Sequence, residues 1–573
     1  MRRVLSVALA CVLALALPAS STQPDSTLAK SVEVSVTNVD VVVTDSKGQA
    51  VTDLTAADFE VRQDGVVQPL TNFSFIRNAP AQALPVEGAP PASPPPATVL
   101  EPATPQAARA HLIVFFDMLH LTTPSKNRAL KSLLSYLPTV VGPNVETQFV
   151  TWDRALRIRG PFTTNVPVLS SLLVSIGEEQ TLGEVARRER ERILREIDSA
   201  ATSDARSRAT LLQNAVSSIR AWCDMQAPEV DSTIDALRSS FSAVAGVDGR
   251  KVLFVITEKF TPIPGRDLWD YLLYGAARTG GAMQLPQSAN VNSLTFTHWD
   301  RGASFRTLTH AANAAGISLV AVDAEGLTTD EMLTSENAAG LGRMDESIGQ
   351  QDMHTAFGLL ADQTGGKLLA GRNDLGLALK GMEADWTAYY SLGYESPGAK
   401  PGEPRSIRVT VNRPGAVARS RKTVIERSPE EKVADGVLSS VHIPRTINPL
   451  RASLNIGVGK KSGKTWLVPL EFKVPFDKLT LVPQGGRARG ALLFTAVAAT
   501  PDGRISPVVT ERAPIDVPEG DLAKLSGKAF SYSATLKVRP GPQVFSVGLT
   551  DEVSRLTSYV QPHVLVGDKP GTP

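Results

Sequence analysis

Three short apolar runs in the middle of the chain each end in a carboxylate. They are His111–Asp117, Lys251–Glu258 and Ile317–Asp323. Uninterrupted apolar runs of this length, rich in β-branched and aromatic residues, are typical of parallel strands that are buried on both faces. Because the carboxyl ends of parallel strands share one edge of a sheet, where open α/β sheets bind ligands, we expect three acids along one edge.

Helical periodicity alternates with these runs and predicts a Rossmann-like α/β domain over residues 109–387. A charged stretch at about 178–245 interrupts the alternation. Its apolar residues recur at helical spacing, so it predicts a helical insertion, a projecting hairpin that the sheet does not need for folding. Glutamates alternate with its arginines and no aromatic stacking platform is interleaved, which indicates a salt-bridged face rather than a nucleic-acid surface.

Period-two alternation predicts β structure at both ends of this domain. Residues 30–78 form an N-terminal β unit, and 388–425 form a further series of strands. Each is too small for a core of its own, so we expect the two to pack together. Short strands and Gly/Pro turns over 449–566 predict a β-sandwich of immunoglobulin or fibronectin type. Residues 79–108, rich in Pro and Ala, and 426–448 are predicted linkers.

The N-terminus predicts export. Arg2 and Arg3 precede an apolar segment, Val4–Leu17, and small residues follow it, which is typical of a signal peptide over residues 1–21. The destination is the periplasm, the cell surface or the exterior. No later apolar run has the length of a membrane span. Without residues 1–21, Cys223 is the only cysteine, which excludes an intramolecular disulfide.

Composition and charge name no partner. The chain has 573 residues, 42% of them hydrophobic, with 59 Lys and Arg against 58 Asp and Glu. Such a balance gives no electrostatic reason to expect nucleic acid or an anionic membrane as a partner.

Several short motifs occur in a fixed order and together resemble the von Willebrand factor A-related domain family of the Acidobacterial type, over about residues 32–425. The motifs are Val41–Gly48, Val51–Glu60, Leu359–Gly366, Asn373–Asp374, Tyr389–Tyr394 and Arg408–Pro414. The resemblance implies a secreted protein whose Rossmann-like domain binds other proteins. In such domains, an Asp-x-Ser-x-Ser motif, a threonine and a later acid form a metal-ion-dependent adhesion site, whose hard oxygen ligands suit Mg²⁺.

Carried over onto this chain, the resemblance implies a degenerate metal site. Asp117 matches the first aspartate, but Leu119 and Leu121 replace the two serines, and Glu258 stands where the later acid is expected. With two hydroxyl ligands lost, Asp117 and Glu258 are the residues left to hold Mg²⁺, and we expect weak binding or none. We expect this turn to present an apolar surface to a partner instead.

The candidate partner-binding residues belong to two segments. The turn after the first acidic strand supplies Leu119, His120 and Thr122, and the long excursion over 261–306 supplies Trp269, Tyr271 and Trp299. Loops at this edge of an α/β sheet commonly carry binding function. The aromatic residues of the excursion could equally pin it onto the domain.

The sequence thus favours a non-enzymatic, adhesion-type protein that binds a protein or cell-envelope ligand. An envelope hydrolase is the alternative, with His120 beside Asp117 as an acid–base pair. No Gly-x-Ser-x-Gly, His-Glu-x-x-His or phosphate-binding glycine loop supports it. A third reading has the C-terminal β-sandwich bind carbohydrate.

Overall fold

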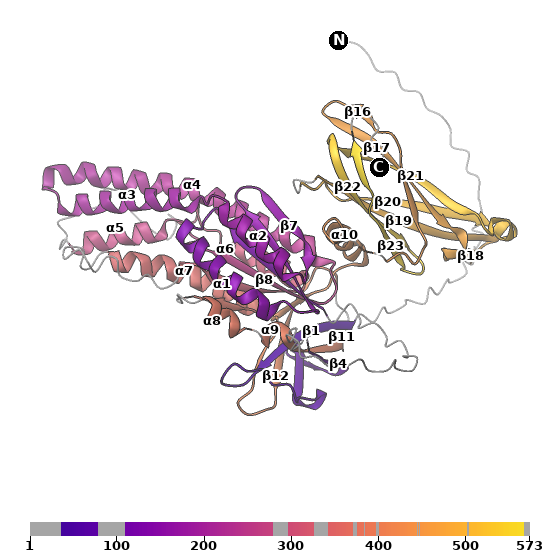
Figure 1. Cartoon of the computed structure of the whole chain (residues 1–573), viewed down its shortest axis with the longest axis horizontal. Coiled ribbons are helices and arrows are strands. Elements are labelled where there is room, and N and C mark those ends of the chain that lie inside the picture. The colour runs from indigo at the N-terminus through magenta and orange to yellow at the C-terminus, as the bar shows by residue number, and fades with distance from the viewer. Residues whose placement is uncertain are drawn as a thin grey trace, which may run out of the picture.

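A computed structural model of the chain consists of an α/β domain with a helical arm and two all-β parts (Figure 1). The structure describes residues 36–77, 109–278, 296–325, 342–370, 375–382, 384–396, 400–443, 445, 447–500 and 504–566. The predicted signal peptide, the predicted linker 79–108 and the Asn373–Asp374 motif lie outside the described residues. No helix in these ranges is long and apolar enough to span a membrane.

The α/β domain is built on a six-stranded sheet in the order β10-β9-β8-β5-β6-β7. The three central strands are the apolar runs that end in acids, and every residue of β5 and β8 is buried. Neighbouring strands are parallel except β7, an antiparallel edge strand that forms a hairpin with β6 and was not predicted. The strands are β5 Ala110–Asp117, β6 Val145–Trp152, β7 Leu156–Thr163, β8 Arg250–Thr257, β9 Ile317–Asp323 and β10 Lys367–Leu369.

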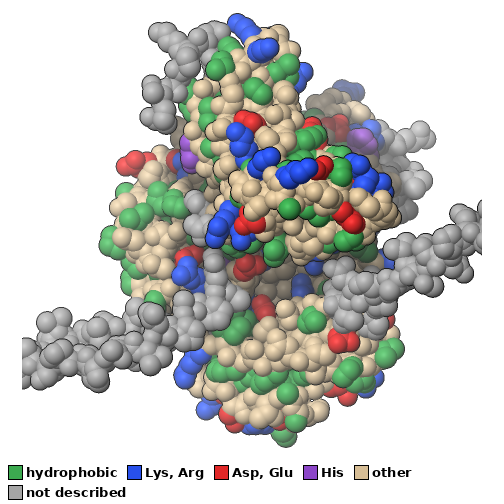
Figure 2. All heavy atoms as spheres, turned by 90° about the vertical axis from the view of Figure 1, so that its right-hand side faces the viewer, with side chains coloured by type: hydrophobic (Ala, Val, Ile, Leu, Met, Phe, Trp, Pro, Cys, Tyr) green, Lys and Arg blue, Asp and Glu red, His purple; other side chains and the backbone are tan. Residues whose placement is uncertain are grey.

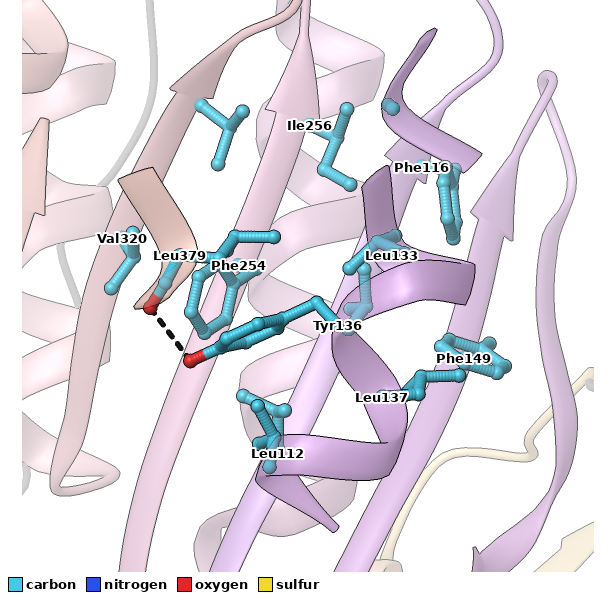
Figure 3. Close-up of a cluster of buried hydrophobic side chains, with 14 of the residues drawn as sticks. Leu112, Phe116, Leu133, Tyr136, Leu137, Phe149, Phe254, Ile256, Val320 and Leu379 are labelled. Atoms are coloured by element: carbon cyan, nitrogen blue, oxygen red, sulfur yellow. Dashed lines mark hydrogen bonds between the residues drawn. The ribbon is translucent and has the colours of Figure 1, made fainter. Parts of the chain in front are cut away.

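Helices cover both faces of this sheet, as in other doubly wound folds. On one face, α1 and α2 pack with α8 and α9 over a core that includes Phe116, Phe149 and Phe254 (Figure 3). The Tyr136 hydroxyl in this core donates a hydrogen bond to the Leu379 carbonyl oxygen at 2.6 Å. Helices α6, α7 and the second half of α4 cover the other face. The bounds are α1 Thr123–Val140, α2 Val166–Glu178, α6 Gly302–Ala314, α7 Gly342–Gln363, α8 Leu375–Lys380 and α9 Ala384–Thr387.

The predicted insertion is a pair of long helices, α3 (Gly183–Thr202) and α4 (Ala205–Ala245). Helix α5 (Arg266–Arg278), which follows β8 in the chain, packs against them. Their own core includes Ile197, Ile219 and Trp269, and Figure 1 shows them extending away from the sheet. We call α3, residues 205–227 of α4, and α5 the arm. The thiol of Cys223 is buried in this core, and burial raises its pKa to about 12.

The prediction that all of residues 178–245 could be dispensed with is wrong. The second half of α4 places a helical stripe of Val230, Ile234, Leu237, Phe241 and Val244 on the sheet. These side chains share a core with Phe115 and Val255 of the central strands. Only the arm projects. The apolar stripe of α4 passes from the core of the arm into the core on the sheet, and Pro228 lies in the helix where the two cores meet.

The N-terminal β unit and the strands after the α/β domain form one sandwich. One sheet has the order β13-β1-β11-β4 and the other β14-β12-β2-β3. Val41 lies opposite Tyr390, and Val61 lies opposite Val409, so the two segments expected to pack together are paired. Thr37 Oγ1, where the sandwich begins, donates to Glu426 Oε1, just after its last strand, at 2.9 Å. The strands are β1 Val36–Thr44, β2 Phe59–Gln63, β3 Val66–Gln68, β4 Leu70–Arg77, β11 Ala388–Glu395, β12 Pro404–Val411, β13 Val417–Arg419 and β14 Thr423–Ile425.

The segment predicted as a linker at 426–448 is instead largely a packed helix, α10 (Pro429–Ser440). Ser428 and Glu431 form a capping box at its start, and Pro429 occupies its first turn. Val433 and Val437 pack against Val497 of the C-terminal domain, and Gly246, after α4, lies against the backbone at Asp435. The polar, proline-containing sequence that indicated a linker is therefore a helix start.

The C-terminal domain is a β-sandwich with strands from Ser453 to Val566, within the predicted range. Its two sheets are centred on β17 and β19, and Phe472 stacks on Phe494 between them with ring centroids 5.2 Å apart. The strands are β15 Ser453–Ile456, β16 Lys460–Ser462, β17 Thr465–Pro475, β18 Val482–Gln484, β19 Arg487–Ala499, β20 Val509–Pro518, β21 Ala529–Val538, β22 Gly541–Asp551, β23 Thr557–Val560 and β24 His563–Val566.

Candidate functional site

The carboxyl edge of the α/β sheet carries the three strand-ending acids. We call the residues there, 117–122, 257–260 and 323–325, the rim. Asp117, Glu258 and Asp323 are exposed by 0%, 4% and 2% respectively, so none of these carboxylates faces solvent. A buried carboxylate needs hydrogen-bond donors, and the chain itself supplies them.

Asp117 is held by two side chains of the rim. Its Oδ2 lies 2.7 Å from Nδ1 of His120 and accepts a hydrogen bond from Thr257 Oγ1 at 2.8 Å. The first contact closes the turn after β5, and the second ties that turn to the end of β8. Asp117 therefore joins two neighbouring strands at their carboxyl ends.

Glu258 makes the reciprocal connection. Its Oε2 accepts hydrogen bonds from the backbone nitrogen of Thr122 at 3.0 Å and from the Thr122 hydroxyl at 2.8 Å. Thr122 is also the N-cap of α1. Burial and the nearby charge of Glu325 raise the pKa of Glu258, against the opposing effect of the Thr122 hydrogen bonds. The carboxyl thus fixes the start of α1 on the sheet.

His120 is the most unusual residue of the rim. Its side chain is 8% exposed, and its ring lies 5.0 Å from that of Phe260. Burial lowers the pKa of His120, but the charge of Asp117 and its hydrogen bond outweigh this effect and raise the pKa. The other ring nitrogen, Nε2, is buried and has no hydrogen-bond partner among the described residues.

The start of α3 covers this turn. The backbone nitrogen of Leu182 donates to the carbonyl oxygen of Met118 at 2.8 Å, and that of Gly183 donates to Leu121 at 3.2 Å. A Cβ atom at position 183 would overlap the carbonyl oxygens of His120 and Leu121, so only glycine allows this approach. The rim is therefore the base on which the arm stands.

The loop after β9 is fixed in the same way. Asp323 Oδ2 lies 2.8 Å from Nε2 of His354, and Lys259 pairs with Glu325 at 3.0 Å. Arg128 of α1 donates to the carbonyl oxygens of Ala324 and Glu325 at 2.9 and 2.8 Å. All three acidic strand ends are thus connected to neighbouring elements by polar contacts within the chain.

The turn after β5 does not present the apolar surface that we expected from it. Leu119 is 3% exposed and lies in the core on one face of the sheet, whereas Leu121 is fully buried in the core on the other. Thr122 is 6% exposed and is occupied by Glu258. The two leucines that replace serines bind the turn to both layers of the domain.

The three aromatic candidates are also interior residues rather than a binding surface. Trp269, Tyr271 and Trp299 are at most 6% exposed and belong to the core of the arm. Tyr271 donates to Asp198 and Trp299 to Asp224, each at 2.8 Å. They pin the excursion onto the arm. This is the second of the two interpretations that the sequence left open.

The residues of the rim do not fit Mg²⁺ as they stand. The contacting oxygens of Asp117 and Glu258 already accept hydrogen bonds from the chain, and the His120 ring lies 2.7 Å from Asp117 Oδ2. No group of three or more His, Cys, Asp or Glu side chains suited to a metal occurs in the described ranges.

Sequence reasoning missed Thr257 as a part of the rim, and Arg128 and Gly183 as residues that contact it. Thr257 directly precedes Glu258, so the end of that strand carried a usable signal. Arg128 and Gly183 carry none, because their contacts depend on where α1 and α3 are placed by tertiary packing.

Comparison with known proteins adds little. No family model and no curated protein matches the chain. A structural-genomics target, SoR45, is 11% identical, covers 22% of this chain and 95% of its own, and has a TM-score of 0.16. An aerotolerance-related membrane protein from Bacteroides fragilis is 8% identical, covers 48% and 98%, and has a TM-score of 0.23. A β-glucuronidase from Bacteroides uniformis is 10% identical, covers 31% and 19%, and has a TM-score of 0.15. At these scores, none of the three indicates a function.

Proposed function

We propose that the chain is an exported binding protein of the von Willebrand factor A-related type. Its α/β domain and arm bind a protein or cell-envelope ligand and catalyse no reaction. The motif order of residues 32–425 and the parallel sheet with strand-ending acids support the type. The face in Figure 2, on the side of the molecule away from the arm, has Lys and Arg interspersed with Asp and Glu and so gives no electrostatic reason to expect a polyanion there.

One observation carries the proposal: the acids of the rim are engaged within the chain. Asp117 and Glu258 accept hydrogen bonds from His120, Thr257 and Thr122, and the start of α3 lies over them. Carboxylates used in this way stabilise a scaffold. We therefore assign partner binding to the arm, which this scaffold carries.

The outer face of the arm suits a protein partner. Val185 of α3 is 69% exposed, and Arg188 and Arg195 are exposed on the same helical stripe. Met225 of α4 is 47% exposed. Apolar side chains beside arginines are common in protein interfaces.

Photo-crosslinking tests this function. A photoreactive residue replaces Arg188 in the mature chain, residues 22–573, which is mixed with the organism's own envelope fraction and irradiated. We expect one dominant adduct that an excess of unlabelled protein removes. The same residue in place of exposed Lys537, on the C-terminal sandwich, is the matched control and should give no such adduct. Equal adduct patterns from both positions would contradict the proposal.

The alternative hydrolase rests on the Asp117–His120 pair. Its 2.7 Å contact orients the ring as an acid–base pair requires, but Nε2 is enclosed and has no nucleophile at hydrogen-bond distance among the described side chains. Incubation with p-nitrophenyl esters tests it. Turnover that His120→Ala abolishes and that exposed His310→Ala leaves unchanged would establish the hydrolase and overturn the binding-only reading.

A further inference from the structure

A cleft of about 780 Å³ lies where the N-terminal β-sandwich meets the α/β domain. One side is β12, the other is β13 with the residues that follow it, and the turn after α7 closes one end. We call this cleft the slot. Its lining includes Arg62, Arg408, Val409, Ala418, Arg419 and Lys422. It contains none of the rim or arm residues.

One edge of β12 is unpaired along the slot. On one side, β12 pairs with β2 over Ile407–Val411. On the other side it pairs with β14 over Pro404–Ser406, and Ile407 N donates to Lys422 O at 2.8 Å. Asp64 N donates to Ser406 O at 3.0 Å, so the even-numbered residues of β12 bond to β2. The backbone groups of Val409 therefore point the other way, into the slot, because antiparallel hydrogen bonds alternate between the two sides.

The course of the chain explains why this edge is open. After β12 the chain turns back at residues 412–416, where Ala416 N donates to Arg413 O at 3.2 Å. Strand β13 then joins the other sheet, with Val417 opposite Thr44. A hairpin that would normally have paired β12 with β13 is thus split between two sheets, and residues of both strands line the slot.

The slot is positively charged. Arg62 lies directly opposite Arg408 in the β2–β12 register and pairs with Glu60 at 2.6 Å. Arg408 is exposed and has no ion pair among the described residues. Arg419 and Lys422 stand on the other side, each paired with an aspartate. A carboxylate of a bound molecule would supply the partner that Arg408 lacks.

We propose that the slot binds an extended acidic peptide of a partner protein. The peptide adds a short strand to the free edge of β12 at Val409, and its carboxylates bind Arg408 and Arg62. Ile407 N already donates to Lys422 O, so the free part of this edge is residues 408–411, about 13 Å long at about 3.3 Å per residue. The site goes beyond the binding surface proposed for the arm and is independent of it.

Fluorescence anisotropy tests the proposal with the mature chain, residues 22–573. The probe is a fluorescein-labelled peptide of alternating valine and glutamate, six residues long. We expect saturable binding that weakens at high salt, and at least tenfold weaker binding to Arg408→Glu. The charge reversal Lys537→Glu, at an exposed strand position of the C-terminal sandwich, is the matched control and should bind as the wild type does.

Two further measurements test strand addition itself. Val409→Pro removes the backbone donor that faces the slot and spares the ladder with β2, so it should fold and lose binding. A peptide N-methylated at alternate residues should bind the wild-type protein at least tenfold more weakly, which keeps the test valid if Val409→Pro fails to fold. Equal binding of the methylated peptide, equal binding to Arg408→Glu, or no saturable binding below millimolar peptide would each overturn the proposal. None of these outcomes bears on crosslinking through the arm.

Discussion

The rim and the slot differ in whether their charged groups have partners within the chain. At the rim, buried acids meet donors from the same chain, and the start of α3 covers the result. At the slot, Arg408 has no ion pair among the described residues and lies beside an unpaired strand edge. The strand-ending acids, which are conspicuous in the sequence, are thus part of the scaffold. The binding site that we propose lies instead at β12, a strand with an ordinary alternating pattern.

If the rim is structural, loss of the Asp117 carboxylate should lower the free energy of unfolding more than any other change proposed below. Asp117→Ala leaves the buried His120 and Thr257 without their acceptor, and breaking a buried charge pair costs about 3–5 kcal/mol. The free energy of unfolding in urea, followed by tryptophan fluorescence, measures the loss. Asp477→Ala, at an exposed position of a short 3₁₀ helix, should change it by less than about 0.5 kcal/mol. Similar values for both variants would remove the structural role.

Crowding the contact between arm and rim should have the next largest effect. Gly183→Ala places a Cβ against the carbonyl oxygens of His120 and Leu121, and such overpacking costs about 1–3 kcal/mol. We expect faster proteolysis within the arm and a lower free energy of unfolding. Gly520→Ala, where nothing lies within 4 Å of the new atom, is the matched control. Unchanged proteolysis of Gly183→Ala would mean that α3 is not seated on the rim.

The contribution of His120 to stability should depend on pH. The pKa of His120 is raised in the folded state above its ordinary value of 6.5. The resulting stabilisation is complete below 6.5 and is lost as the pH rises through the folded pKa. The difference in unfolding free energy between wild type and His120→Gln should therefore shrink from pH 6 to pH 9. A difference that grows with pH would contradict the raised pKa of His120.

At the slot, reversal of one charge should act in opposite directions on folding and on binding. Arg408→Glu replaces a like-charged pair with Arg62 by an opposite pair, which should stabilise the sheet by about 0.2–1 kcal/mol. Hydrogen exchange of the β2 and β12 amides measures this gain. Faster exchange in the variant would indicate that the two guanidinium groups do not oppose each other.

The smallest expected effect is that of Mg²⁺ or Mn²⁺ on the purified protein. Because the contacting oxygens of Asp117 and Glu258 already accept hydrogen bonds, calorimetry should show no saturable site at sub-millimolar metal. A one-to-one isotherm that disappears in Asp117→Ala would instead restore a metal-dependent adhesion site and make the rim the binding centre.

The sequence was sufficient where periodicity alone decides the structure. Runs such as His111–Asp117 predicted the central strands, and the small size of residues 30–78 predicted a partner sheet. It was insufficient where one pattern fits two environments. The helical stripe of α4 continues from the arm onto the sheet, and the polar start of α10 resembles a linker. An aromatic residue such as Trp269 has the same sequence signature whether it lies in a core or on a binding surface.

The hydrogen bond between Thr37 and Glu426 places the entry and the exit of the first sandwich side by side. The α/β domain is inserted between β4 and β11, far from either point along the chain. Tension applied between the N-terminal and C-terminal segments would therefore enter and leave the sandwich at nearly one place. Such a force would peel β1 from β11 before it could stretch the α/β domain, which stays out of the mechanical path until the sandwich opens.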